Sequence, residues 1–123
     1  MKKILVVDDA SIIRTILENA LKTAGFQVVS APSAYTGIEE AKKNPDVALI
    51  VSDYTMPGLN GLDMLEKIRE HNESFKKVPV VMVTTECSTP IKSRGQKLGV
   101  CAWLLKPFDP IKAAEAITKI LSR

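Results

Sequence analysis

The chain has 123 residues, of which 46% are hydrophobic, 25% charged and 5% aromatic, and its 17 basic and 14 acidic residues leave a formal net charge of +3. A chain of this length can bury a core without disulfide or metal staples, so we expect one globular domain spanning residues 1–123. No apolar run approaches the roughly 20 residues of a membrane helix, and the apolar stretch after Met1 stops at Asp8, too early for a secretory signal. A cytoplasmic protein is therefore expected.

Five short apolar runs predict β-strands. In chain order they cover residues 4–7, 26–31, 47–51, 80–83 and 101–105, the second being the weakest. The other runs are continuous rather than alternating, which is typical of parallel strands buried on both faces. The sequence thus predicts a parallel sheet.

Helical periodicity fills the intervals between these strands. Apolar residues recur at helical spacing over 12–24, closed by Gly25 as a C′ residue, over 62–68 and over 111–121. Weaker patterns predict helices near 33–43 and 89–98. Gly95 lies inside the last of these, where it costs about 1 kcal/mol relative to alanine, so we expect that helix to be the most pliable. Strand and helix alternate throughout, which predicts an α/β fold, a single-domain doubly wound (βα)5 sandwich.

Polar side chains follow four of the five predicted strands. In chain order they are Asp8, Asp9, Asp53, Thr84, Thr85, Glu86 and Lys106. In doubly wound sheets, ligands bind beyond the carboxyl ends of the strands. Neighbouring carboxylates repel unless a cation relieves them, and Mg²⁺ suits such oxygen ligands. Together with a lysine and a hydroxyl, this pattern predicts a phosphoryl-binding site, although Asp9 alone could instead cap a helix beginning at Ala10.

These residues carry a resemblance to the receiver domain of two-component response regulators, in particular to its stand-alone chemotaxis type. The resemblance covers the whole chain and rests on five segments: Leu5-Val6-Val7-Asp8-Asp9, Asp53-Tyr54-Thr55-Met56-Pro57, Gly61, Val83-Thr84 and Lys106-Pro107-Phe108. It implies a flavodoxin-like five-stranded parallel sheet with strand order 2-1-3-4-5 and a cis bond between Lys106 and Pro107.

The resemblance also implies a metal-assisted phosphoacceptor. Asp53 would accept a phosphoryl group from a histidine kinase or from a small phosphodonor. Asp9 and Asp53 would bind Mg²⁺ directly, whereas Asp8 would act through water. The backbone carbonyl of Thr55 would be a further ligand.

Other residues take supporting roles by the same resemblance. Lys106 would pair with the phosphoryl oxygens, Thr84 would hydrogen-bond one of them, and Trp103 would follow Thr84 as the aromatic switch. Hydrolysis and access would be tuned by Thr55, Thr85 and Glu86. Two positions depart from the family: Thr85 stands where a small residue is usual, and Trp103 where tyrosine or phenylalanine is common.

Charge and partners complete the expectation. Residues 92–123 hold seven basic residues against two acidic ones, which indicates either a solvated face or a face that meets an acidic partner. By resemblance the partners are a histidine kinase and a downstream protein, the latter bound at the fourth helix, fifth strand and fifth helix. We expect a monomer that binds neither nucleic acid nor membrane. It would be a signalling switch rather than an enzyme, catalysing only its own phosphoryl transfer and dephosphorylation.

Four other functions compete with this one. A flavodoxin-like electron carrier needs a phosphate-binding loop after the first strand, where Asp8 and Asp9 would repel phosphate. A haloacid-dehalogenase-like phosphatase needs an Asp-x-Asp motif at one strand end, and the sequence has none. A nucleic-acid binder could use the basic late segment, but no recognition-helix motif or stacking aromatic residues accompany that segment. A degenerate receiver used only for docking remains an alternative. Cys87 and Cys101 fit no metal or redox motif and are expected to be buried free thiols.

Overall fold

The computed structural model describes residues 1–85 and 88–122, and in this part of the chain strands and α-helices alternate. The elements in chain order are β1 (Lys3–Val7), α1 (Ser11–Thr23), β2 (Gln27–Ala31), α2 (Ala34–Lys43), β3 (Val47–Asp53), α3 (Gly61–His71), the short 3₁₀ helix η1 (Glu73–Phe75), β4 (Val80–Thr84), α4 (Thr89–Leu98), β5 (Val100–Leu105) and α5 (Pro110–Leu121). The second strand begins one residue later than predicted.

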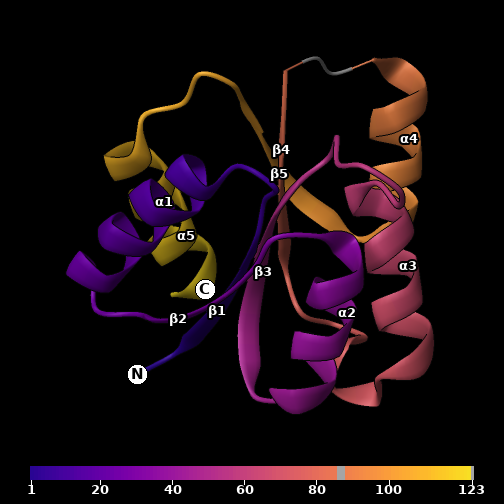
Figure 1. Ribbon diagram of the computed structural model, residues 1–123, viewed down its shortest axis with the longest axis horizontal. Coiled ribbons are helices and arrows are strands. Elements are labelled where there is room, and N and C mark those ends of the chain that lie inside the picture. The colour runs from indigo at the N-terminus through magenta and orange to yellow at the C-terminus, as the bar shows by residue number, and fades with distance from the viewer. Residues whose placement is uncertain (86–87, 123) are drawn as a thin grey trace.

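The strands form one parallel sheet in the order β2-β1-β3-β4-β5, which confirms the predicted fold class and strand order. Helices α1 and α5 cover one face of the sheet, and α2, α3 and α4 cover the other (Figure 1). The carboxyl ends of all strands therefore meet at one edge. Within the described residues, no helix combines the length and hydrophobicity that crossing a bilayer requires.

Each face of the sheet has its own hydrophobic core. Side chains of β1 alternate between the two: Leu5 and Val7 join the core under α2 and α3, whereas Ile4 and Val6 join the core under α1 and α5. Strands β3 and β4 divide in the same way, which explains why their sequences are continuously apolar. Burial on both faces holds these strands in place, and with them the polar residues that follow their carboxyl ends.

Strand β5 departs from the predicted burial on both faces, because it is the edge strand of the sheet. Its side chains are only partly buried, and those of Cys101 and Leu105 are exposed. The prediction of a buried thiol is therefore wrong for Cys101, which is free and exposed, with its Sγ 3.4 Å from the carbonyl of Val80. Cys87 lies outside the described residues.

The predicted stop signal of α1 is confirmed, but its start differs from the expectation. Gly25 follows the helix with a φ of 96°, a left-handed conformation that glycine adopts readily. At the other end, Ala10 is the N-cap and offers no side-chain cap. The Asp8 carboxylate accepts the backbone N–H of Ala10 instead, at 2.9 Å, so Asp9 does not cap this helix.

Helix α4 lies against the indole of Trp103. A Cβ atom at Gly95 would collide with this ring, so the glycine allows a close approach of α4 to β5. Gly95 therefore has a packing role that its low helix propensity did not indicate. The greater pliability of α4 stays a prediction.

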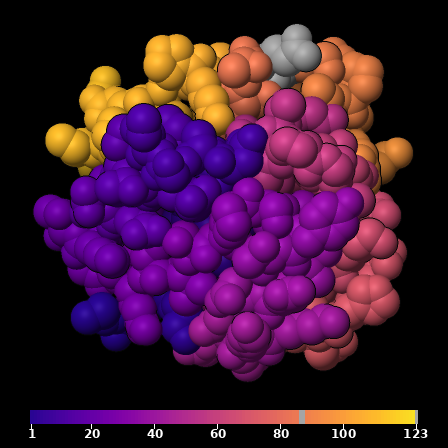
Figure 2. Space-filling model, viewed as in Figure 1, coloured from indigo at the N-terminus to yellow at the C-terminus, as the bar shows by residue number. Residues whose placement is uncertain are grey.

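The face seen in Figure 2 is built mainly by the first half of the chain. The late residues that carry the basic excess appear along its upper and outer margins. One of these basic residues is paired within the protein, because Nη2 of Arg94 in α4 lies 2.8 Å from Oδ1 of Asp63 in α3, in a partly exposed ion pair. The surface excess in the late segment is accordingly smaller than the sequence count indicates.

Candidate functional site

Backbone hydrogen bonds hold the strand ends of the sheet level with one another. The register pairs Val7 of β1 with Ser52 of β3, and Asp53 with Val83 of β4. One step further, the N–H of Lys106 donates to the carbonyl of Thr84 at 2.8 Å. Of the polar residues predicted to gather at this edge, those that the structure describes therefore lie there: Asp8, Asp9, Asp53, Thr84, Thr85 and Lys106.

Three carboxylates form the centre of the site. Asp8, Asp9 and Asp53 each place a carboxylate oxygen within 4.8 Å of the others. Asp8 and Asp53 are 1% and 5% exposed, so water cannot fully solvate their charges, whereas Asp9 is exposed at the rim. Neighbouring carboxylates repel one another, and two of these three are buried. A small divalent cation with oxygen ligands would relieve this repulsion.

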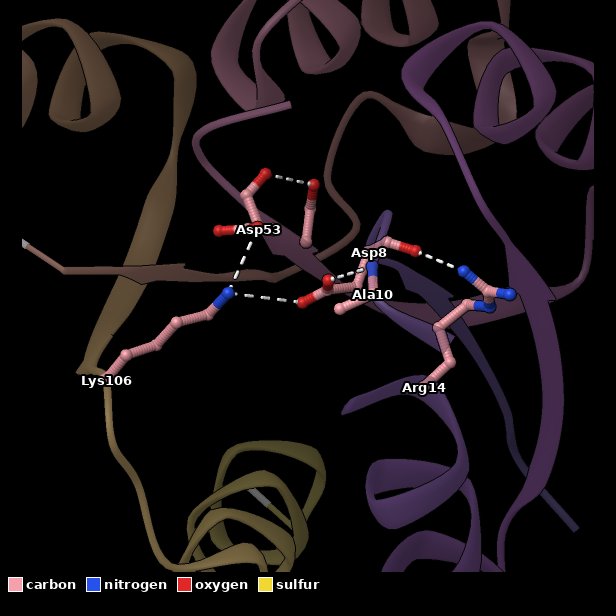
Figure 3. Close-up of polar contacts among 6 residues, drawn as sticks. Asp8, Ala10, Arg14, Asp53 and Lys106 are labelled. Carbon is pink, nitrogen blue, oxygen red and sulfur yellow. Dashed lines mark hydrogen bonds and ion pairs between the residues drawn. The ribbon is translucent and has the colours of Figure 1, made fainter. Parts of the chain in front are cut away.

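Lys106 provides the positive charge opposite these acids. Its Nζ lies 3.1 Å from Oδ2 of Asp53 and 3.5 Å from Oδ2 of Asp8, so one ammonium group bridges two strand ends (Figure 3). Burial works against the charged lysine, but the bonds and charges of Asp53 and Asp8 outweigh it and raise the pKa of Lys106. The peptide bond that follows, to Pro107, is cis as expected.

The balance is different for Asp53. Burial raises the pKa of its carboxyl, the negative charges of Asp8 and Asp9 add to the rise, and the hydrogen bond from Lys106 only partly offsets it. The ionised Asp53 is thus held in a site that does not fully stabilise its charge. Such a group gains from any cation that approaches it.

Two neighbours that support Asp53 were not among the predicted site residues. The buried hydroxyl of Ser52 donates to the carbonyl of Asp53 at 2.9 Å. A Cβ atom at Gly61 would collide with that same carbonyl and lie 2.7 Å from Sδ of Met82, so only glycine allows α3 to begin this close to β3. The glycine was visible in the sequence as a helix start, but its contact across the fold was not.

The remaining predicted residues take different positions around the site. Thr84 is buried at the end of β4, while Thr55 and Thr85 are exposed in the loops after β3 and β4. Trp103 is partly buried against the core on the α4 side of the sheet. Glu86 lies outside the described residues.

A hollow of about 400 Å³ opens beside Lys106. Its lining is mostly apolar and consists of Ile13, Ile16, Thr85, Lys106, Pro107, Phe108 and Pro110. Thr85 therefore lies in the wall of the space that adjoins the charged centre. A molecule that reaches Lys106 from this side passes the side chain of Thr85.

We expect Asp53→Asn to stabilise the protein against urea at pH 7.5 in EDTA. Because the folded-state pKa of Asp53 is raised, its ionised form costs folding free energy above that pKa, and the cost disappears as pH falls through the carboxyl range. The gain in urea midpoint should therefore shrink at pH 4. A urea midpoint that is lower for Asp53→Asn than for wild type at pH 7.5 would contradict the inference that the folded site destabilises the ionised Asp53.

Asp46→Asn is the matched control for that comparison. Asp46 is an exposed carboxylate 3.0 Å from Nζ of Lys3, and the hydrogen bond from Lys3 lowers its pKa. Removing this charge should give no gain in stability at pH 7.5. The two variants thus separate the burial of Asp53 from a general effect of removing one acidic residue.

Known proteins match this chain over almost its full length. The sequence profile of the response regulator receiver domain matches residues 4–118. Chemotaxis protein CheY1 of Helicobacter pylori strain J99 is 36% identical over 120 residues, which are 97% of this chain and 96% of that protein. Chemotaxis protein CheY-3 of Vibrio cholerae is 36% identical over 122 residues, 98% of this chain and 92% of that protein.

Solved structures agree with the sequence matches. The structure of Vibrio cholerae chemotaxis protein CheY4 superposes with a TM-score of 0.91 and 32% identity, covering 98% of both chains. A CheY-like receiver domain protein from Methanospirillum hungatei superposes with a TM-score of 0.88 and 27% identity, covering 99% of this chain and 94% of that one. Fold, acidic centre and sequence thus agree, and this chain belongs to the response regulator receiver domain family.

Proposed function

We propose that this protein is a phosphorylation-activated response regulator in which Asp53 accepts the phosphoryl group. The observation that carries the proposal is the ammonium of Lys106 at 3.1 Å from the buried Asp53 carboxylate, with two further carboxylates beside it. A carboxylate nucleophile flanked by a cation suits phosphoryl transfer, because the reaction depends mainly on positioning and on neutralising charge.

The residues divide the work of that reaction as follows. One carboxylate oxygen of Asp53 forms a bond to phosphorus while the bond from phosphorus to the donor's nitrogen or oxygen breaks, and the electron pair leaves with the donor. Lys106 neutralises the phosphoryl oxygens as their charge redistributes, and the hydroxyl of Thr84 donates a hydrogen bond to one of them. The product is an acyl phosphate on Asp53. The protein thereby acts as a signalling switch that catalyses only its own phosphorylation and dephosphorylation.

Mg²⁺ is the proposed cofactor, and the donor set fits it. Asp9 and Asp53 would hold the ion directly, Asp8 would hold it through water, and the backbone carbonyl of Thr55 would be a further ligand. Mg²⁺ prefers one or two protein carboxylates and leaves positions for water and phosphate oxygens. When bound, the ion supplies additional neutralisation of the phosphoryl oxygens.

The partners follow from family membership. We propose a histidine kinase as phosphodonor and a downstream protein that binds the face formed by α4, β5 and α5. The relatives above are named as chemotaxis proteins, which supports a role in chemotaxis or motility signalling in the cytoplasm. The protein would act as a monomer without contacting nucleic acid directly. Trp103 would transmit the change at Thr84. Thr55 and Glu86 would tune hydrolysis of the phosphoryl group, and Thr85 would restrict access to the site.

The test is intact mass after incubation with acetyl phosphate and Mg²⁺. Wild type should gain the mass of one phosphoryl group, and so should Asp46→Asn, which lacks an exposed carboxylate far from the site. Asp53→Asn should gain none, and EDTA should prevent the gain in wild type. A phosphoryl group on Asp53→Asn would contradict the assignment, and no gain in wild type would favour a docking module that works without phosphorylation.

Thr85→Ala should speed phosphorylation by acetyl phosphate, because it removes a β-branched side chain from the wall of the hollow beside Lys106. The rate of mass gain measures this effect. Thr23→Ala, at the exposed end of α1, is the control and should leave the rate unchanged. An equal or slower rate for Thr85→Ala would contradict the idea that this threonine restricts access.

A further inference from the structure

Arg14 of α1 reaches back to the turn that carries the first two acidic residues. Its Nη1 donates to the backbone carbonyl of Asp8 at 2.7 Å, and this guanidinium is half-buried beside the site (Figure 3). No motif or apolar periodicity in the sequence singles out Arg14. Its contact belongs to the geometry of the site.

Asp8 is held from several directions. Its N–H donates to the carbonyl of Ala31 at 3.1 Å, and its carboxylate accepts the N–H of Ala10 at 2.9 Å. The carboxylate also lies 3.5 Å from Lys106. The hydrogen bond from Arg14 also holds the carbonyl of Asp8, and thereby orients the peptide plane between Asp8 and Asp9.

Asp9 has no such support of its own. Within residues 1–85 and 88–122, no hydrogen bond or ion pair involves the Asp9 carboxylate, and the residue is exposed at the rim of the cluster. The direction of its side chain therefore depends on the backbone that precedes it. That backbone is the peptide whose carbonyl Arg14 fixes.

We infer that Arg14 is a positioning residue that orients the Asp8–Asp9 peptide and thereby presents the Asp9 carboxylate to a divalent cation. This inference rests on the proposed function, because it concerns the same Mg²⁺ site. Groups that orient metal ligands typically contribute tenfold or more to metal affinity. Arg14 would do so although its own positive charge repels the ion.

That repulsion makes the sign of the effect informative. If Arg14 acted only as a charge, replacing it with a neutral side chain would tighten Mg²⁺ binding. If it acts by holding the Asp8 carbonyl, the same change weakens binding, because Asp9 is no longer directed toward the ion. A role in stability alone would leave the affinity of the folded protein unchanged.

The experiment is a calorimetric titration of the metal-free full chain with Mg²⁺. We expect Arg14→Met to bind Mg²⁺ about tenfold more weakly than wild type. Lys22→Met removes the same charge from the exposed last turn of α1 and should change the affinity by less than about twofold, since salt screens distant surface charges. Should Arg14→Met not fold, Arg14→Lys keeps the charge without the guanidinium fork and should also bind Mg²⁺ more weakly than wild type.

Two outcomes overturn the inference, and they are distinguishable. Mg²⁺ affinity that is equal or tighter in folded Arg14→Met, or in Arg14→Lys where that variant is used, refutes the positioning role and leaves the proposed function intact. Absence of Mg²⁺ binding to wild type refutes the metal site itself and the inference with it.

Discussion

Lys106→Met should lower the rate at which acetyl phosphate phosphorylates the protein by about a hundredfold, the usual effect of removing one preorganised donor to a developing negative charge. Among the residues that the structure describes, the Lys106 ammonium is the one cation in ion-pair contact with Asp53, at 3.1 Å, and it also reaches Asp8. Methionine keeps most of the side-chain length but leaves no charge. The measurement is the rate of mass gain at saturating Mg²⁺.

The Mg²⁺ affinity of the same variant distinguishes loss of catalysis from damage to the site. The ammonium repels a cation that approaches the three carboxylates, so Lys106→Met should bind Mg²⁺ as tightly as wild type or more tightly. Lys112→Met, at an exposed position of α5, is the charge-matched control and should keep the wild-type rate. A rate for Lys106→Met within threefold of wild type would mean that this lysine does not neutralise the transferred group.

The sequence predicted the polar centre of the site because its residues follow buried strands. A continuous apolar run ending in a charged residue indicates a parallel strand and the edge of the sheet at which its last residue emerges. Asp53 and Lys106 are 53 residues apart in the sequence, and the strand order that brings them together was implied by the family resemblance rather than by the apolar pattern. Of the strands, only β5 was assigned the wrong burial, because a local apolar pattern does not tell an edge strand from a central one.

Contacts that depend on the depth of packing between elements could not be predicted in this way. Gly61 resembled an ordinary helix start, but glycine is required there because a Cβ atom would collide with the carbonyl of Asp53 and with Met82. Gly95 resembled a weak point in a helix, whereas the ring of Trp103 occupies the space beside it. Arg14 belongs to no motif in the sequence, but its guanidinium contacts the carbonyl of Asp8. In each case the deciding partner comes from another element, at a distance that no local pattern specifies.

The structural role of Arg69 could not be predicted from the sequence. This arginine lies on α3, where a charged residue between apolar positions indicates a solvated face. In the fold its guanidinium is half-buried and donates to four backbone carbonyls, those of Phe75, Lys76, Val78 and Leu98. These carbonyls belong to the segment that leads into β4 and to the end of α4. One side chain therefore ties three parts of the chain together at the edge opposite the acidic site.

Arg69→Met should lower the free energy of unfolding by about 3 kcal/mol, because several carbonyls lose a charged donor at once and methionine offers no replacement. Burial lowers the pKa of Arg69, but arginine still stays charged across the accessible pH range, so the loss should not vary between pH 6 and 9. Urea unfolding gives the midpoint and slope. Lys67→Met, exposed on the same helix, removes one charge without these bonds and should change stability by less than about 0.5 kcal/mol. Equal midpoints for the two variants would mean that water replaces the guanidinium without cost, and that the four carbonyls do not depend on Arg69 for their satisfaction.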